Sequence, residues 1–134
     1  MSTFPLKIVT PDGLIYDGSA ERLIVRSSTG DLAIMARHIN FVTPLGMGKA
    51  TVIADGKRRE AACIGGMLSV VDGTVTLVPT TFEWADKIDV QRAEASQHRA
   101  EDILHSKNST DTDLKLAEAR LHRALVRKSV ASHK

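Results

Sequence analysis

The sequence predicts an antiparallel β domain followed by a helical hairpin, and two observations support this prediction. Up to about residue 80, turn pairs such as Asp12-Gly13, Asp55-Gly56 and Asp72-Gly73 separate short runs rich in Val and Ile, and this spacing is typical of antiparallel strands. Residues 88–105 contain neither Gly nor Pro and are rich in Ala, Glu, Arg and Gln, which favours a helix. We therefore expect a sandwich or barrel with a helical appendage.

Seven runs are candidate strands of the β domain. The strand pair around Asp72-Gly73 is the clearest, because this dipeptide supplies the positive backbone angles of a type I′ turn and Pro79 ends the ladder. Alternation in the second run places Leu23 and Val25 towards the core. The seven runs are residues 6–10, 21–27, 32–35, 49–54, 59–64, 68–71 and 75–78.

Polar turn residues at 106–113 divide the helical region into two helices. The first is expected over residues 88–105 and the second over about 114–130, with Thr112 or Asp113 as its N-cap. Because both apolar stripes are narrow, the hairpin is expected to dock on the β domain or on a partner. The stripe residues are Ile88, Ala95, Ala100, Ile103 and Leu104 in the first helix and Leu114, Ala117, Leu121, Ala124, Leu125 and Lys128 in the second.

Composition excludes several function classes. A chain of 134 residues fits one domain with an appendage, and its formal net charge of +2 is too small to argue for nucleic acid. The single cysteine, Cys63, is expected to be a buried small hydrophobe, with a reactive thiol as the less favoured alternative. No segment resembles a signal peptide or is apolar for long enough to span a bilayer. The tail from Arg120 to Lys134 is basic, and this charge fits either an acidic partner or an ordinary helix C-terminus.

Catalytic and metal-binding motifs are largely absent from the sequence. A phosphate loop at Gly48-Lys49 would need Gly at position 43 and Ser or Thr at position 50, where the chain has Thr43 and Ala50. His98, Asp102 and His105 have the helical spacing of a metal site, but the same spacing fits a solvated surface, which we favour. The sequence therefore predicts neither an enzyme nor a metal protein.

One strip on the first helix has binding potential. Ile88, Asp89, Arg92 and Arg99 lie within roughly a third of the helix circumference, with Ala93 at the border. If the hairpin folds back, Arg123 and Arg127 on the second helix face this strip. Guanidinium groups bind phosphates bidentately, Asp89 can accept a hydrogen bond from a base or ribose, and Ala93 leaves room for a flat ring. A nucleotide is one candidate ligand, and an ordinary surface ion pair between Asp89 and Arg92 is the alternative.

The order of these parts resembles the epsilon subunit of bacterial F-type ATP synthases over nearly the whole chain. The resemblance rests on "LKIVTPDGLIYDG", "GDLAIMARHINFVTPLGMGKATV", "GGMLSVVDGTVTLV" and "IDVQRAEAS". It implies a flattened β-sandwich of about ten strands in residues 1–84 and a regulatory antiparallel two-helix hairpin in residues 85–134. The chain departs from the family pattern at residues 35–40, where His38 remains but the usual Pro-Gly and following Pro are absent.

The resemblance also implies a non-catalytic rotor subunit of the central stalk, which couples proton or sodium transport to ATP synthesis. The sandwich would bind the gamma subunit and, through Gly30, Asp31 and His38, the loops of the c-ring. Arg123, Arg127 and Lys128 would contact a catalytic beta subunit, and the helices also alpha, when the extended hairpin inhibits hydrolysis. The implied location is peripheral, at the cytoplasmic face of the bacterial cell membrane, without direct membrane insertion.

Some members of the family bind ATP in the folded form, as a regulatory ligand rather than a required cofactor. The corresponding residues here are Glu83, Ile88, Asp89, Arg92, Ala93, Arg99, Arg123 and Arg127. Two alternatives remain at this point. One is a purely structural coupling subunit without nucleotide sensing, and the other is a basic helical hairpin that binds nucleic acid, which we disfavour.

Overall fold

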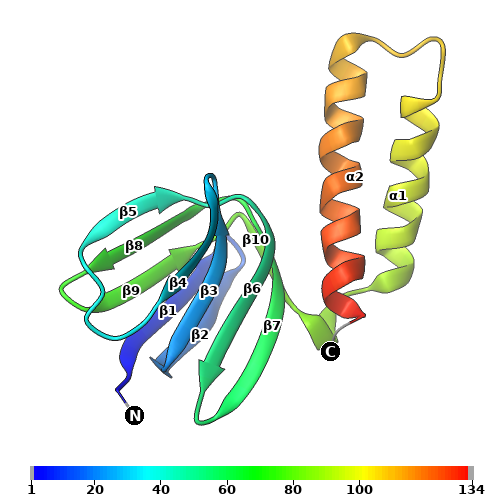
Figure 1. The fold of residues 1–134 in the computed structure, drawn as a ribbon. Helices are drawn as coiled ribbons and strands as arrows, with labels where there is room; N and C mark the ends of the chain where they lie inside the picture. Colours follow the sequence, from blue (N-terminus) through cyan, green and yellow to red (C-terminus); the bar gives the residue numbers. More distant parts are fainter. Residues whose placement is uncertain (1, 133–134) are drawn as a thin grey trace.

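The computed structural model describes residues 2–132, which form a two-layer β-sandwich with an antiparallel helical hairpin beside it (Figure 1). Every pair of neighbouring strands is antiparallel except β1 and β9, which are parallel. One sheet has the order β2 (Gly13–Ala20), β1 (Phe4–Thr10), β9 (Thr74–Val78), β8 (Met67–Val71) and β5 (Phe41–Pro44). The other has the order β10 (Thr81–Trp84), β7 (Lys57–Ile64), β6 (Met47–Ala54), β3 (Arg22–Ser27) and β4 (Gly30–Ile34).

The core lies between the two sheets and consists mainly of aliphatic side chains. Alternate residues of β1 are buried, as period-two side-chain direction requires. Leu23 and Val25 on β3 are fully buried, which confirms the inward face predicted for this strand. Cys63 on β7 is also buried in this core. Its pKa rises from 9.0 to about 12 because burial disfavours the thiolate, so the thiol behaves as the small hydrophobe that the sequence predicted.

The ten strands match the number implied by the resemblance, but the seven-strand list was incomplete. The missing strands are β2, β5 and β10. Most of β2 is solvent-exposed at a sheet edge, so it shows little apolar alternation. β5 and β10 have four residues each, which is too short for a periodic signal.

Two tight turns meet at one end of the sandwich. Asp72 and Gly73 have φ values of 50° and 83°, as a type I′ turn requires. In the altered segment, Arg37 has a φ of 66°. Asn40 Oδ1 accepts a hydrogen bond of 2.8 Å from Asp72 N, and Asn40 Nδ2 donates one of 3.3 Å to Asp72 Oδ1. The amide of Asn40 therefore fixes this segment against the β8–β9 turn without the family's prolines.

The helices begin at positions other than those predicted. A short 3₁₀ helix, η1 (Ala85–Lys87), precedes α1 (Val90–Leu104), and α2 covers Asp111–Ala131. Asp89 caps α1 by accepting a hydrogen bond from Arg92 N, so the helix starts after Asp89 instead of at Ile88. Thr110 caps α2 in a reciprocal capping box with Asp113. The predicted caps at Thr112 and Asp113 are therefore wrong, because Thr110 offers both halves of the box.

Small residues set the contact between α1 and α2. Ala93 and Ala100 on α1 and Ala117 and Ala124 on α2 are buried, and Lys128 Nζ donates a hydrogen bond of 2.8 Å to Gln97 Oε1 across the pair. Two stripe residues were predicted wrongly, since Ala95 and Leu125 are exposed. The hairpin seam therefore consists mainly of alanines seven residues apart, which allow the helices to approach closely.

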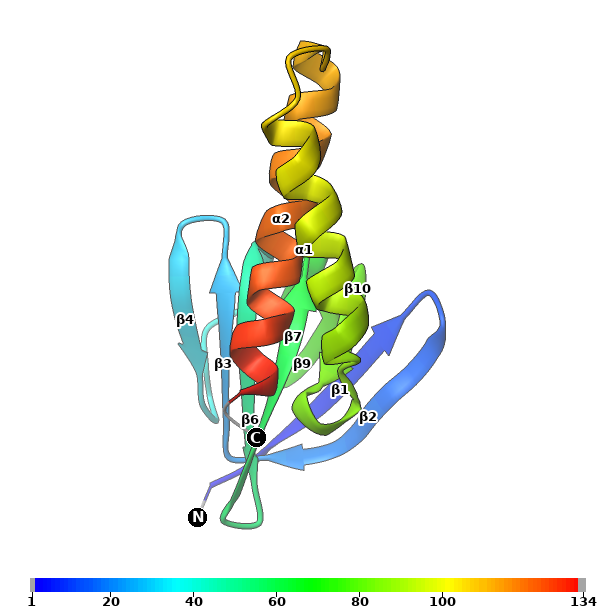
Figure 2. The same cartoon turned by 90° about the vertical axis from the view of Figure 1, so that its right-hand side faces the viewer.

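The hairpin docks on the sandwich only near its base. The last turn of α2 packs on β6, β7 and η1, and the far end of the hairpin extends beyond the sandwich (Figures 1 and 2). The docking cluster consists of Ala62, Ala85, Ile88, Val130 and Ala131, with Val126 partly buried against it. Three of these six side chains are alanines, so the docked hairpin is held by a limited apolar area.

Candidate functional site

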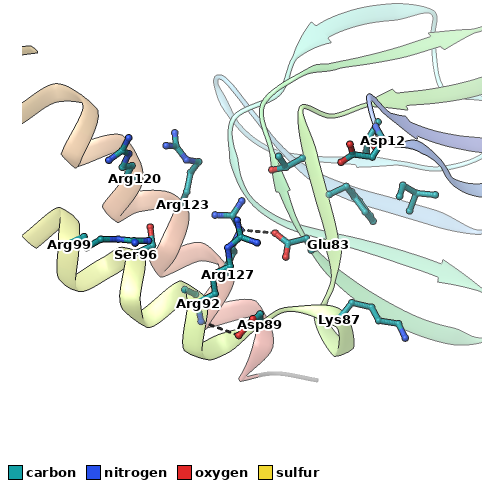
Figure 3. Close-up of a pocket in the computed structure, with 15 residues that line it drawn as sticks. Asp12, Glu83, Lys87, Asp89, Arg92, Ser96, Arg99, Arg120, Arg123 and Arg127 are labelled. Atoms are coloured by element: carbon teal, nitrogen blue, oxygen red, sulfur yellow. Dashed lines mark hydrogen bonds and ion pairs between the residues drawn. The ribbon is translucent and has the colours of Figure 1, made fainter. Parts of the chain in front are cut away.

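A cavity of about 900 Å³ lies between the hairpin and the β10 edge of the sandwich (Figure 3). Both helices and the β1–β2 end of the sandwich contribute to its wall. The lining residues are Thr10, Asp12, Ile15, Thr81, Phe82, Glu83, Lys87, Asp89, Arg92, Ala93, Ser96, Arg99, Arg120, Arg123 and Arg127.

The hairpin side of the cavity is formed by arginines that the helical period places on one side. On α1, Arg92 and Arg99 each precede a buried alanine of the seam, and on α2 Arg123 precedes Ala124. Asp89 Oδ1 accepts a hydrogen bond of 3.0 Å from Arg92 N, so this carboxylate is used as a helix cap. An ion pair between the two side chains, the alternative considered from sequence, is not the contact that forms.

One ion pair joins the hairpin to the sandwich across the cavity. Arg127 Nε lies 2.7 Å from Glu83 Oε1, and the two side chains are 24% and 35% exposed. Glu83 lies on β10 and Arg127 on the penultimate turn of α2. This charge-assisted hydrogen bond is partly shielded from water, which makes it stronger than an exposed pair.

The remaining arginines of the cavity are not neutralised. Within residues 2–132, no carboxylate lies within ion-pair distance of Arg92, Arg99, Arg120 or Arg123. Of the carboxylates that line the cavity, Glu83 pairs with Arg127 and Asp89 caps α1. The hairpin wall therefore carries a surplus of guanidinium groups, which suits a ligand with several negative charges.

The sandwich side of the cavity has a different character. Ile15 and Phe82 contribute apolar side chains, and Thr10, Thr81 and Asp12 contribute polar ones. The hydroxyl of Thr81 is buried and has no hydrogen-bond partner among the described residues. An apolar surface with a few polar groups is typical of a small-molecule site, so the cavity has one cationic wall and one mixed wall.

The structure brings together most of the residues singled out from sequence. Glu83, Asp89, Arg92, Ala93, Arg99, Arg123 and Arg127 line the cavity, whereas Ile88 belongs to the docking cluster. Sequence reasoning did not assign Arg120, Lys87, Ser96 or the sandwich wall to this site. Arg120 lies three residues before Arg123 and seven before Arg127, so the helical period alone could have indicated it.

The predicted partner residues lie in two separate places. Gly30 begins β4, and neighbouring Asp31 is exposed and lies 3.4 Å from Arg26. His38 is partly exposed in the segment before β5, with its ring against Phe41 at a centroid distance of 4.9 Å. Lys128 and Arg127 lie on α2 and already bond to Gln97 and Glu83. The docked hairpin therefore engages two of the cations predicted to meet a partner.

The metal-site and membrane-span questions raised by the sequence can be examined in the structure. Across residues 2–132, no group of three or more His, Cys, Asp or Glu side chains is arranged to hold a metal ion. His98 lies near Glu101 on the exposed surface of α1. In the same range, no helix combines the length and hydropathy needed to cross a membrane.

Comparison with known proteins gives consistent matches over both parts of the chain. Residues 3–85 match the β-sandwich domain of the ATP synthase delta/epsilon chain, and residues 86–132 match its long α-helix domain. The chain is 44% identical to the ATP synthase epsilon chain of Bacillus velezensis, over 99% of this chain and 100% of the relative. It is 39% identical to that of Shouchella clausii, over 100% and 98%.

A solved structure has the same fold. A chain in the mitochondrial ATP synthase of Euglena gracilis superposes with a TM-score of 0.84 at 19% identity, covering 100% of this chain and 83% of that one. The chain belongs to the ATP synthase delta/epsilon family. Its matched bacterial relatives are epsilon chains, and it is accordingly an epsilon subunit of an F-type ATP synthase, a non-catalytic member of that complex.

Proposed function

We propose that this epsilon chain is a rotor subunit of the central stalk whose hairpin regulates ATP hydrolysis and senses ATP through the cavity. The observation that carries the proposal is the surplus of unpaired arginines where the hairpin faces the sandwich. Support for the stalk position comes from a Tetrahymena thermophila chain of related fold, with a TM-score of 0.63 at 14% identity over 95% of each chain, whose structure is described as central stalk and c-ring.

A nucleoside triphosphate fits the chemistry of the cavity. Its volume of about 900 Å³ is within the usual range for small-molecule sites. Guanidinium groups bind phosphate oxygens through paired hydrogen bonds, and the cavity presents them from both helices. The carboxylates and the apolar wall lie towards the sandwich, where they suit a base or ribose.

Ligand binding at this cavity would favour the docked hairpin. Because Glu83 and the sandwich wall come from one domain and most arginines from the other, the complete site exists only in the docked state. A ligand at one hundred times its dissociation constant stabilises the state that binds it by about 2.7 kcal/mol. ATP therefore shifts the hairpin by the difference between its affinities for the two states.

The released hairpin is proposed to act on partners. Release from the sandwich frees Arg127 from Glu83, and separation of the two helices frees Lys128 from Gln97. These cations, with Arg123, can then meet an acidic surface of the catalytic beta and alpha subunits. The sandwich is proposed to contact gamma and, through Gly30, Asp31 and His38, the c-ring loops. On this basis we propose that the subunit lies at the cytoplasmic face of the bacterial cell membrane, where it couples ion transport to ATP synthesis.

Calorimetric titration of the full chain with ATP and with ADP in magnesium buffer tests the sensor. Saturable ATP binding that weakens in Arg92→Ala supports it, and Lys115→Ala is the matched control because Lys115 is exposed on α2 outside the cavity. The fluorescence of Trp84 provides an independent signal, since this residue follows Glu83 in the chain. The guanidinium of Arg59 lies 3.7 Å from the centroid of its ring. Absence of heat and of a fluorescence change up to millimolar ATP would refute nucleotide sensing.

A second candidate is a coupling subunit without nucleotide sensing. The bond from Arg127 to Glu83 favours it, because it holds the hairpin on the sandwich without any ligand, and the bond from Lys128 to Gln97 holds the two helices together. In that case ATP would not protect the amides of α2 from hydrogen exchange, whereas breaking these bonds by substitution would expose them.

A further inference from the structure

Arg120 is a further cation of the cavity. It is not among the nucleotide-binding residues that the family resemblance implied. It lies on the solvent-exposed surface of α2, lines the cavity and forms no ion pair with a carboxylate among residues 2–132. It is also the lining residue of α2 farthest from the docked end of that helix. Its position therefore extends the cationic wall away from the sandwich.

Helix geometry shows that Arg120 points to the same side as the other arginines. At 100° per residue, Arg92 and Arg99 lie roughly 100° before the buried alanine that follows each of them. Arg120 lies three residues after buried Ala117, which places it roughly 60° before that alanine in the same sense. Because α1 and α2 are antiparallel and face each other through these alanines, offsets in the same sense direct the side chains to one common side.

The register of the hairpin places Arg120 and Arg99 along the same seam of buried alanines. Ala100 and Ala117 are both completely or almost completely buried in the seam, with 0% and 1% exposure, and Gln97 bonds to Lys128 nearer the base. Arg99 lies between the seam alanines Ala93 and Ala100, and Arg120 lies between Ala117 and Ala124, so both arginines belong to the stretch where these buried alanines face each other. Figure 3 shows Arg120 beside Arg123, with Arg99 on the facing helix.

Charge along the cavity fixes which part of a nucleotide would lie here. Asp89 is at the base of the hairpin, and Glu83 and Asp12 lie on the sandwich side (Figure 3). These carboxylates repel phosphates, so the phosphate chain begins beside Arg92 and Arg123 and extends towards Arg99, which only its far end reaches. Arg92 and Arg99 are seven residues apart, which is roughly 10 Å along the helix. A longer phosphate chain therefore reaches further along this span, towards Arg120.

We propose that Arg120 is a specificity-determining residue that recognises the terminal phosphate of a triphosphate together with Arg99. A diphosphate ends before this pair and gains little from Arg120. The assignment rests on the proposed function, because it names which part of the ligand the far end of the same cavity binds. It makes the hairpin respond to ATP in preference to ADP.

The test is calorimetric titration of the full chain and of Arg120→Gln with ATP, ADP, inorganic tripolyphosphate and pyrophosphate. Arg120→Gln is expected to weaken ATP and tripolyphosphate about tenfold, as loss of one charge-assisted contact predicts, and to change ADP and pyrophosphate by less than about twofold. Lys115→Gln removes an exposed cation of α2 outside the cavity and is expected to change none of them.

The outcomes separate this inference from the proposed function. Equal weakening of ATP and ADP in Arg120→Gln, or no weakening of either, overturns the assignment while nucleotide sensing stands. If tripolyphosphate binds with the expected dependence on Arg120 but ATP does not bind, nucleotide sensing fails and the recognition of a phosphate chain stands. Arg120→Lys, with helix content checked by circular dichroism, keeps the charge without the fork and is expected to lose part of the discrimination.

Discussion

Glu83 and Arg127, separated by 44 positions in the chain, join β10 to α2 through a hydrogen bond of 2.7 Å. Together with the small apolar docking cluster, this pair holds the hairpin against the sandwich. Because the same two side chains line the cavity, the contact that docks the hairpin and the site proposed for the ligand share residues.

Glu83→Gln is expected to weaken docking of the hairpin by about 1 kcal/mol, since it removes the charge from a partly shielded pair. That change corresponds to about fivefold faster hydrogen exchange for amides that are exposed by undocking. Hydrogen exchange without nucleotide measures it at η1 and the last turn of α2. Glu94→Gln, at an exposed position of α1, is the control, and equal acceleration across the sandwich strands would contradict the prediction.

Val130→Ala is expected to weaken docking by about 1 to 2 kcal/mol, because it removes two buried methyl groups from the docking cluster. Val130 is 2% exposed, whereas Val90 on α1 is 37% exposed, so Val90→Ala is a matched substitution expected to stay within about 0.5 kcal/mol. Urea unfolding followed by helical circular dichroism and Trp84 fluorescence compares the two. Equal effects of both variants would show that Val130 does not anchor the hairpin.

Asn40→Ala is expected to cost about 1 kcal/mol of sandwich stability, because it removes both hydrogen bonds to Asp72. The loss should appear in the unfolding of the sheets and leave docking of the hairpin unchanged. Asn108→Ala, in the exposed turn between the helices, is the control. A stability loss no larger than that of the control would mean that the backbone holds the segment after Arg37 without the Asn40 amide.

Burial of Cys63, which raises the pKa of its thiol from 9.0 to about 12, predicts a pH dependence of stability. The unfolded chain releases this proton above pH 9, whereas the folded chain keeps it until about pH 12. The contribution of the buried thiol to folding stability is therefore complete below pH 9. Between pH 9 and about pH 12 it decreases by up to about 1.4 kcal/mol per pH unit. The difference between the wild type and Cys63→Ala in urea unfolding at pH 8 and pH 10 isolates it, and a constant difference would refute it.

Local sequence patterns predicted the elements that bury alternate or helically spaced side chains. β3, the β8–β9 hairpin and both helices belong to this group. β2 was missed because only a sheet edge, and no apolar alternation, defines it, and β10 because its four residues pair with β7 only once the sandwich forms. Strands of this kind depend on tertiary pairing that a single sequence does not show.

Only the part of the candidate site that helical geometry determines could be predicted from the sequence. The arginines of α1 and α2 follow from the 3.6-residue period. The sandwich wall formed by Ile15 and Phe82 depends on where the hairpin docks, and no local pattern encodes that position. The role of Ile88 could not be read from its place in the motif, because its burial under Val130 and Ala131 arises from residues distant in sequence.

Because the hairpin is docked only at its base, it can act as a lever. α2 has 21 residues and is about 30 Å long at 1.5 Å per residue. A tilt of about 10° at η1 would therefore carry the far turn through about 5 Å, by the same helix length. Sub-ångström adjustments around Ile88 and Arg127 are thus amplified into displacements at the tip that are large enough to meet or leave a neighbouring subunit.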